Sequence, residues 1–187
     1  MESTPRNNVC SVERAGALDI SLRKLFQSPK RILKPYIKEG MTVADIGCGP
    51  GFFTIEMAKL VGHNGKVTAV DLQDGMLAIV RGKTENSNLR IIVEFHNCKD
   101  NKIGLSKTFD FILVFYMLHE VPDQTAFLTE LNSLIKPGGK ILIVEPKFHV
   151  TKNDFDNSGI KMQKAGFTVL DRPKIFFSRS VVLEKTI

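Results

Sequence analysis

Short apolar runs alternate along the chain with segments in which apolar residues recur every three or four positions. Strand-like runs occupy residues 42–46, 66–70, 90–95, 109–116, 140–144, 167–170 and 176–183. Helical patterns occupy residues 52–61, the stretch around Met76, Leu77 and Val80, residues 123–135 (ended by Lys136-Pro137-Gly138-Gly139) and residues 154–165. This alternation predicts βαβ units and a mainly parallel sheet with helices on both faces. Residues 171–174 are too few for a parallel crossover, so the last strand should run antiparallel.

Two further amphipathic segments precede the first strand. An apolar stripe over residues 18–26 predicts a helix, Pro29 interrupts the pattern, and residues 32–37 resume it as a second helix. We expect the first helix to close over a bound ligand and the second to pack on an outer face of the sheet. With no repeat and no linker, residues 1–187 are predicted to form one domain, divided into an N-terminal helical segment (1–40) and a core (41–187).

The composition is that of a water-soluble globular protein, with 187 residues, 43% of them hydrophobic and 25% charged. The longest apolar run, residues 111–118, is far below the roughly 20 residues that a membrane span needs, and the first ten residues lack a secretory pattern. Cys10, Cys48 and Cys98 are odd in number and widely spaced, which favours neither a disulfide framework nor a zinc site. A reducing, cytoplasmic setting is expected.

The net charge of +6 permits a polyanionic partner without indicating one. Lysines and arginines are spread along the chain, and only residues 23–38 hold several close together. A nucleic-acid interface needs charge focused on one surface. A nucleic-acid partner is therefore disfavoured but stays open, and the sequence leaves the oligomeric state open as well.

The residues that indicate chemistry follow the first two strands. Asp45, Gly47, Gly49 and Gly51 are spaced as D-x-G-x-G-x-G, and Asp71 lies about 20 positions further on. Glycines at a strand-to-helix turn let the backbone approach a ligand, and a carboxylate after the second strand accepts hydrogen bonds from ribose hydroxyls. Each feature alone has a structural alternative, a tight turn or a helix cap, but together they predict a site for an adenosine-containing cofactor.

The spacing also distinguishes between cofactors. The dinucleotide pattern G-x-G-x-x-G needs a third glycine at position 52, where this chain has Phe52, so binding of a dinucleotide is disfavoured.

Four segments resemble the motifs of class I S-adenosylmethionine-dependent methyltransferases. VADIGCGPGFFT is similar to their first motif and AVDLQDGML to their second, while FDFILVFYMLHEV and LIKPGGKILIVEP resemble the segments of the fourth and fifth strands. The resemblance spans residues 41–146 and is greatest to the small-molecule enzymes of the ubiquinone/menaquinone-biosynthesis type. It implies a Rossmann-like, doubly wound α/β fold of three layers, whose seven-stranded sheet is mainly parallel with an antiparallel last strand. It also implies S-adenosylmethionine as cofactor and a small-molecule methyl acceptor.

The resemblance assigns roles by position. Asp45 would orient the amino-acid end of the cofactor, the three glycines would lie close to its methionine portion, and Asp71 would bind both ribose hydroxyls. The remaining positions are Leu72 and Met76 near the adenine, the backbone around Phe115 facing the cofactor's amino group, and Asn97 and Cys98, or Asp100, beside the adenine amine.

Methyl transfer demands no nucleophilic side chain, and it needs a base only if the acceptor must lose a proton. His119 is the candidate catalytic residue, with Glu120 beside it; an equally good interpretation is that His119 packs or caps the following loop. Tyr116, Lys147 and His149 lie at similar strand ends, where structural roles are the alternative.

Two other classes of function stay open. One is an RNA or protein methyltransferase that uses the basic N-terminal helices, and the other is a non-catalytic cofactor-binding module. The chain lacks the Asp/Asn-Pro-Pro-Tyr/Phe and Pro-Cys motifs of nucleic-acid methyltransferases after its fourth strand. No motif in the sequence identifies the methyl acceptor.

Overall fold

A seven-stranded sheet forms the centre of the protein. The structure is a computed structural model and describes residues 27–186. The strands are β1 (Thr42–Ile46), β2 (Lys66–Asp71), β3 (Val93–Asn97), β4 (Phe109–Phe115), β5 (Ile135–Pro146), β6 (Phe167–Asp171) and β7 (Ser178–Lys185), in the spatial order β3-β2-β1-β4-β5-β7-β6. The first five are parallel, and β7 runs antiparallel to both of its neighbours. The predicted sheet and its antiparallel last strand are thereby confirmed.

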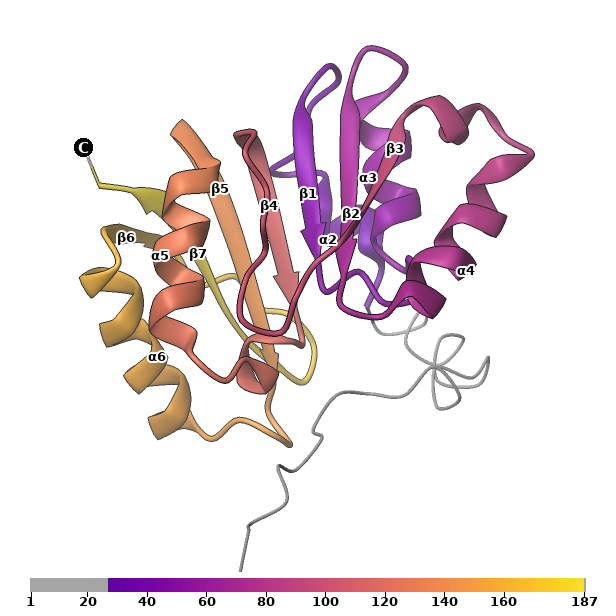
Figure 1. Ribbon diagram of the computed structural model, residues 1–187. Coiled ribbons are helices and arrows are strands. Elements are labelled where there is room, and N and C mark those ends of the chain that lie inside the picture. Colours follow the sequence, from indigo (N-terminus) through magenta and orange to yellow (C-terminus); the bar gives the residue numbers. More distant parts are fainter. Residues whose placement is uncertain (1–26, 187) are drawn as a thin grey trace, which may run out of the picture.

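Helices cover both faces of this sheet (Figure 1). One face carries α2 (Pro29–Leu33), α3 (Thr54–Val61) and α4 (Asp74–Glu85), and the other carries α5 (Gln124–Leu134) and α6 (Lys152–Lys164). Two apolar cores fill the spaces between the three layers. Because β1 and β4 are buried on both faces, their sequences are mainly apolar and do not alternate with polar residues.

The second predicted segment packs on the sheet, as expected, but its helix spans residues 29–33 and not 32–37. Pro29 begins α2 instead of interrupting a helix: Ser28 caps it, and proline suits the first helical position. Leu33 is fully buried, and the ring of Tyr36 stacks on that of Phe111 in β4 with 5.7 Å between centroids. The helix predicted over residues 18–26 lies outside the described residues.

Two further predicted boundaries were wrong. Residues 90–95 do not form one strand, because the Ser87 side chain accepts a hydrogen bond from the Leu89 N–H and starts a 3-10 turn, η2 (Asn88–Ile91). This turn leaves Ile91 exposed, and the strand begins only at Val93.

The second error concerns the end of α5. Lys136-Pro137-Gly138-Gly139 does not separate the helix from a strand at residue 140, because β5 already begins at Ile135. Ile135 pairs with Phe109 and Lys140 pairs with Phe111, so the intervening residues bulge out within the strand. Gly138, with a φ of 73°, makes this bulge possible.

The topology places a switch point at the carboxyl ends of β1 and β4. The chain leaves β1 toward the helices on one face and leaves β4 toward those on the other, so the two connections diverge. Ligands of doubly wound sheets bind at such a switch point. Among the described residues no helix is long and apolar enough to cross a membrane.

Candidate functional site

The glycine-rich turn after β1 is held against the end of β2. The N–H groups of Gly47 and Cys48 both donate to the carbonyl oxygen of Val70, at 2.9 Å. Gly47, Gly49 and Gly51 have φ values of 72°, 51° and 83°, in the left-handed region that side chains with a Cβ rarely adopt. The three glycines predicted from the sequence therefore share one tight turn at the carboxyl edge of the sheet.

The surroundings of these glycines differ. A Cβ on Gly47 would lie 2.8 Å from Met117 Cγ, and one on Gly51 would lie 2.9 Å from Val80 Cγ2. A Cβ on Gly49 would meet nothing within 4 Å. Gly47 and Gly51 thus allow close packing within the protein, while Gly49 is the glycine of the turn with open space beside it.

Asp71, at the end of β2, joins this turn directly. Its Oδ2 accepts a hydrogen bond from Gly49 N at 2.8 Å, and its Oδ1 accepts one from Gln73 N at 2.9 Å. Burial raises the pKa of Asp71 above its usual range, and the backbone donors act in the opposite direction. The two carboxylate oxygens together have about four acceptor positions, so Asp71 can still accept a hydrogen bond from a ligand beside its backbone donors.

Asp45 lies beneath the turn. It is 2% exposed, and its Oδ2 accepts a hydrogen bond of 2.6 Å from Thr54 Oγ1 at the start of α3. Burial raises the pKa of Asp45 to about 7. Asp45 therefore ties the end of β1 to the start of α3, across the glycine turn, and Thr54 is a partner that no motif had indicated.

The ends of β3 and β4 complete the edge. The Asn97 side chain donates to the carbonyl oxygens of Asp71 and Leu72, and Cys98 N also donates to the Asp71 carbonyl. Burial raises the pKa of the Cys98 thiol to about 11. Phe115 is buried at the end of β4, and its ring lies 4.3 Å from that of Phe53.

The other predicted positions differ in exposure. Leu72 is exposed, at 38%, whereas Met76 is buried on α4, at 3%. Asp100, the alternative to Asn97 and Cys98, is exposed. The strand ends thus place the predicted residues at one edge, with Leu72 and Asn97 at its surface and Met76 beneath it.

These residues fit an adenosine-containing sulfonium cofactor by two features. Asp71 keeps acceptor positions for a pair of hydroxyls, and the open space at Gly49 lets a ligand approach the backbone. A buried acceptor at the same edge is unsatisfied: Gln27 is 5% exposed, and its Oε1 has no hydrogen-bond partner within residues 27–186.

Gln27 was not predicted as a site residue. Its Nε2 lies 2.7 Å from the Tyr116 hydroxyl, which in turn lies 2.6 Å from Ser178 Oγ. Tyr116 has a φ of 60°, and such strained backbone is typical of functional sites. No sequence motif surrounds Gln27 or Ser178, and only the fold brings them to the end of β4.

His119 lies in a 3-10 turn, η3 (Leu118–Glu120), after β4. Its Nδ1 is 2.6 Å from Oε2 of Glu145, a buried residue near the end of β5 that was not predicted either. The hydrogen bond with Glu145 raises the pKa of His119 above its usual range. Burial likewise raises the pKa of Glu120. Lys147 and His149 are exposed in the loop after β5, and the ring of His149 stacks on that of His119 at 5.6 Å.

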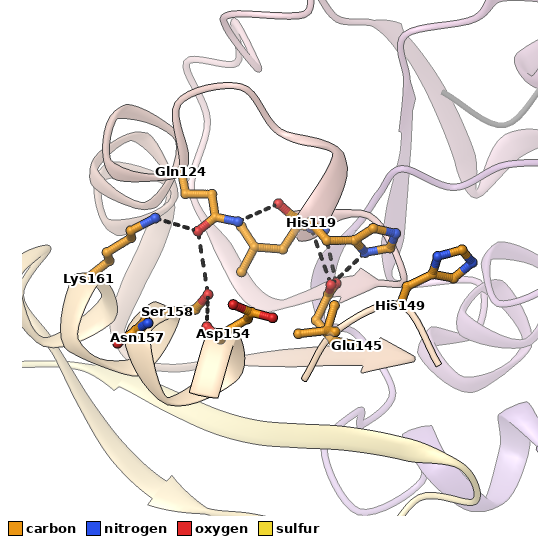
Figure 2. Close-up of a pocket in the computed structure, with 10 residues that line it drawn as sticks. His119, Gln124, Glu145, His149, Asp154, Asn157, Ser158 and Lys161 are labelled. Atoms are coloured by element: carbon orange, nitrogen blue, oxygen red, sulfur yellow. Dashed lines mark hydrogen bonds and ion pairs between the residues drawn. The ribbon is translucent and has the colours of Figure 1, made fainter. Parts of the chain in front are cut away.

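A pocket of about 330 Å³ opens beside this pair (Figure 2). His119 and Glu145 form one wall with His149, and the facing wall comes from the start of α5 and one side of α6. In that wall the Gln124 side chain accepts hydrogen bonds from Lys161 Nζ and Ser158 Oγ. The pocket is predominantly polar.

Comparison with known proteins is consistent with this geometry. Demethylmenaquinone methyltransferases match the chain: that of Staphylococcus saprophyticus is 36% identical over 118 residues (62% of this chain and 49% of the relative), and that of Bacillus mycoides is 33% identical over 109 residues (58% and 46%). The chain thus spans about half the length of the curated relatives it matches.

Solved structures match over more of the chain. A SAM-dependent methyltransferase from Aquifex aeolicus superposes with a TM-score of 0.84 at 29% identity, covering 95% of this chain and 100% of that one. A TehB-like methyltransferase from Corynebacterium glutamicum has a TM-score of 0.74 at 14% identity, covering 94% and 98%, and shares the fold. The family described as "Methyltransferase domain" matches residues 37–172. By this match, which covers most of the sheet and the whole glycine turn, the chain belongs to the methyltransferase domain family.

Proposed function

We propose that this protein transfers the methyl group of S-adenosylmethionine to a small-molecule acceptor. The observation that carries the proposal is the contact between Gly49 N and Asp71 Oδ2. It places the open position of the glycine turn beside a carboxylate that can accept further hydrogen bonds. A ribose binds such a carboxylate through its hydroxyls, while the adjoining chain of the cofactor follows the open backbone.

In this proposal, the residues of the chain bind the cofactor and orient it. Asp71 would accept hydrogen bonds from both ribose hydroxyls, and Asp45 would hold the turn in shape from below. Leu72 would pack near the adenine, with Asn97 and Cys98 at its edge. When bound, the cofactor supplies an electrophilic methyl group on a sulfonium leaving group, so the protein chiefly contributes alignment and exclusion of water.

The relatives guide the choice of acceptor. Demethylmenaquinone methyltransferases are named for a quinone-type acceptor, and this chain matches about half of their length. We therefore propose a small aromatic acceptor that docks where β4 and β5 end. The predicted cytoplasmic setting and a single-domain organisation are part of the same proposal.

Calorimetry tests cofactor binding. S-adenosylmethionine and S-adenosylhomocysteine should bind with similar stoichiometry, and NAD should not bind. Binding of NAD alone would contradict the proposal.

A methyl-acceptor screen with labelled S-adenosylmethionine tests the class of acceptor. It should compare a demethylated naphthoquinol, a primary amine, a peptide mixture and total RNA. Methylation of RNA or peptide alone would replace the small-molecule acceptor by the macromolecular alternative. Cofactor binding without any transfer would favour the non-catalytic binding module.

A further inference from the structure

Glu145 is a buried carboxylate bound by a single turn of chain. It is 2% exposed, and its oxygens accept hydrogen bonds from Leu118 N at 3.1 Å, His119 N at 3.2 Å and His119 Nδ1 at 2.6 Å. A carboxylate this deeply buried is costly unless it is hydrogen-bonded, and three donors from η3 compensate it. Glu145 therefore fixes both the position of the turn and the orientation of the imidazole.

This contact also determines which nitrogen of His119 carries a proton. An ionised carboxylate only accepts hydrogen bonds, so Nδ1 donates to Glu145, and in the neutral ring Nε2 is left with a free electron pair. The side chain of His119 is 25% exposed and lines the polar pocket. Figure 2 shows the second nitrogen of the ring pointing away from Glu145. The free nitrogen lies on the side of the ring toward His149, away from Gln124 and Lys161 (Figure 2), so the pair holds a proton acceptor at that side of the pocket rim.

We propose that His119 is a general base, that Glu145 is its positioning residue, and that the acceptor carries a hydroxyl group which ionises as it is methylated. The proposal rests on the proposed methyl transfer and adds the chemical class of the acceptor. The O–H bond of the acceptor breaks, and its proton passes to Nε2. The electron pair that is released forms the bond to the methyl carbon, directly from oxygen or through a conjugated ring carbon. The electron pair of the broken carbon–sulfur bond stays on sulfur.

Glu145 assists this step electrostatically. Once Nε2 is protonated the ring is an imidazolium, and the charge of the adjacent carboxylate stabilises it, as in the carboxylate–histidine pairs of hydrolytic enzymes. His149, stacked on the same ring, covers it from the side of the loop after β5. A hydroxyl is the group that gains most from such a base, because its oxygen is a poor nucleophile while protonated.

The charged surroundings of His119 come from several elements. The titratable groups that face it or share its pocket are Glu120 in η3, Glu145 in β5, His149 after β5, and Asp154 and Lys161 in α6. Of these, Glu145 has the largest influence and favours the protonated ring. Loss of the carboxylate should therefore lower the pKa of His119.

NMR of the histidine side chains tests the pair without an acceptor. In Glu145→Gln the pKa of His119 should fall by about 1–3 units, as expected when an opposite charge within hydrogen-bond reach is removed. The neutral ring of the unmutated protein should carry its proton on Nδ1, and His119→Gln identifies the signal. An unchanged pKa, or a neutral ring protonated on Nε2, would overturn the proposal.

The pH dependence of turnover tests the base. Acceptor probes are 1,4-dihydroxynaphthalene and catechol, with a primary amine for comparison. His119→Gln should lower kcat for the hydroxyl acceptors about 10²–10⁴-fold at neutral pH, with KM little changed. The deficit should shrink as the pH rises, because the hydroxyl then ionises in solution. An equal deficit at every pH, unchanged kcat, or no methylation of either hydroxyl probe would overturn the proposal.

A second histidine–glutamate pair provides a matched control. His63 Nδ1 lies 4.0 Å from Glu39 Oε1, and both side chains are exposed at the opposite edge of the sheet. His63→Gln and Glu39→Gln should leave the pH profile unchanged. Calorimetry with S-adenosylhomocysteine distinguishes failure of the proposed methyl transfer from failure of the proposed base. Absence of binding to the unmutated protein contradicts methyl transfer itself. Normal binding with a pH dependence other than the expected one contradicts only the role of His119 as a base.

Discussion

At the scale of single residues, Asp71 combines two roles. Its two oxygens brace the glycine turn and the start of α4 through backbone N–H groups, and they remain the charged acceptors at the open position beside Gly49. A substitution there must therefore affect both the shape of the turn and any ligand that donates hydroxyl hydrogen bonds.

Replacement of Asp71 by alanine should weaken the binding of S-adenosylhomocysteine about ten- to a hundredfold. Loss of a hydrogen bond to a charged acceptor costs about 1.5–3 kcal/mol, which corresponds to that change in Kd. Calorimetry measures the affinity, and circular dichroism checks the fold. Asp171→Ala is the matched control, because Asp171 also ends a strand but is exposed on β6, at the far side of the sheet. Unchanged affinity in a folded Asp71→Ala variant would mean that Asp71 only caps the turn.

The residues that share a motif could be located from the sequence, whereas their distant partners could not. Asp45, the three glycines and Asp71 could be predicted because a strand-turn-helix unit brings nearby positions together. Glu145 could not, because its pairing with His119 depends on the register of β4 against β5 and on the 3-10 turn between β4 and α5. The hydrogen bond of Thr54 to Asp45 was missed because a threonine at a helix start has a common structural role.

At the scale of elements, the turn between β1 and α3 contains three glycines with different constraints. All three have positive φ, so alanine at any of them costs about 1–2 kcal/mol of backbone strain. Only Gly49 has open space where a Cβ would point, and the Cβ of a residue at position 51 would meet the side chain of Val80. Substitutions at the two positions should therefore separate ligand binding from folding.

Gly49→Ala should lower the free energy of unfolding by about 1–2 kcal/mol and weaken the binding of S-adenosylhomocysteine, since the methyl group occupies the open space. Gly51→Ala should be less stable, by about 2–5 kcal/mol, because overpacking against Val80 adds to the strain. Urea unfolding and calorimetry measure the two effects.

Two further variants control this comparison. Gly82→Ala, in α4 with nothing within 4 Å of the added Cβ, should leave binding unchanged and raise stability by about 0.5–1 kcal/mol. Val80→Ala should restore part of the stability of Gly51→Ala. Normal binding by Gly49→Ala would exclude its position from the cofactor site.

Element boundaries were predicted less well than element types. The β-branched run at residues 90–95 favoured a strand, but the Ser87 cap favours a 3-10 turn there, and local capping outweighs intrinsic strand preference. Proline and two glycines after α5 indicated a loop, yet the pairing of Ile135 with Phe109 keeps that segment in the sheet. In both places tertiary or capping contacts decide between conformations that the local sequence allows.

At the scale of the whole molecule, the directions of the strands could be predicted because chain connectivity limits them. Alternating strands and helices require crossovers, and the short link between β6 and β7 permits only an antiparallel pair. The resulting site lowers the stability of the fold electrostatically. The carboxyl edge gathers Asp45, Asp71 and Glu120, and burial raises the pKa of each.

The stability of the ligand-free protein should therefore decrease as the pH rises from 5 to 8. A carboxyl whose pKa is higher in the folded state binds more protons folded than unfolded, so the free energy of unfolding falls with rising pH between the two pKa values. For Asp45 these are 3.8 and about 7, a difference of about three units, which is on the order of 4 kcal/mol. His119 acts in the same direction, because its raised pKa gives stability that is lost as the pH rises above its usual value of 6.5.

Urea unfolding at pH 5, 6, 7 and 8 measures this slope, and Asp45→Asn should flatten it, since an amide does not titrate. Asp110, whose pKa is lowered by its hydrogen bond with Lys136, changes stability only below about pH 4 and leaves this window unaffected. Stability that is constant or rises from pH 5 to 8 would mean that the buried carboxyls ionise without cost. The destabilisation at high pH comes from negative charge concentrated at one edge of the sheet. A cationic ligand such as S-adenosylmethionine should therefore stabilise the protein more at pH 8 than at pH 5.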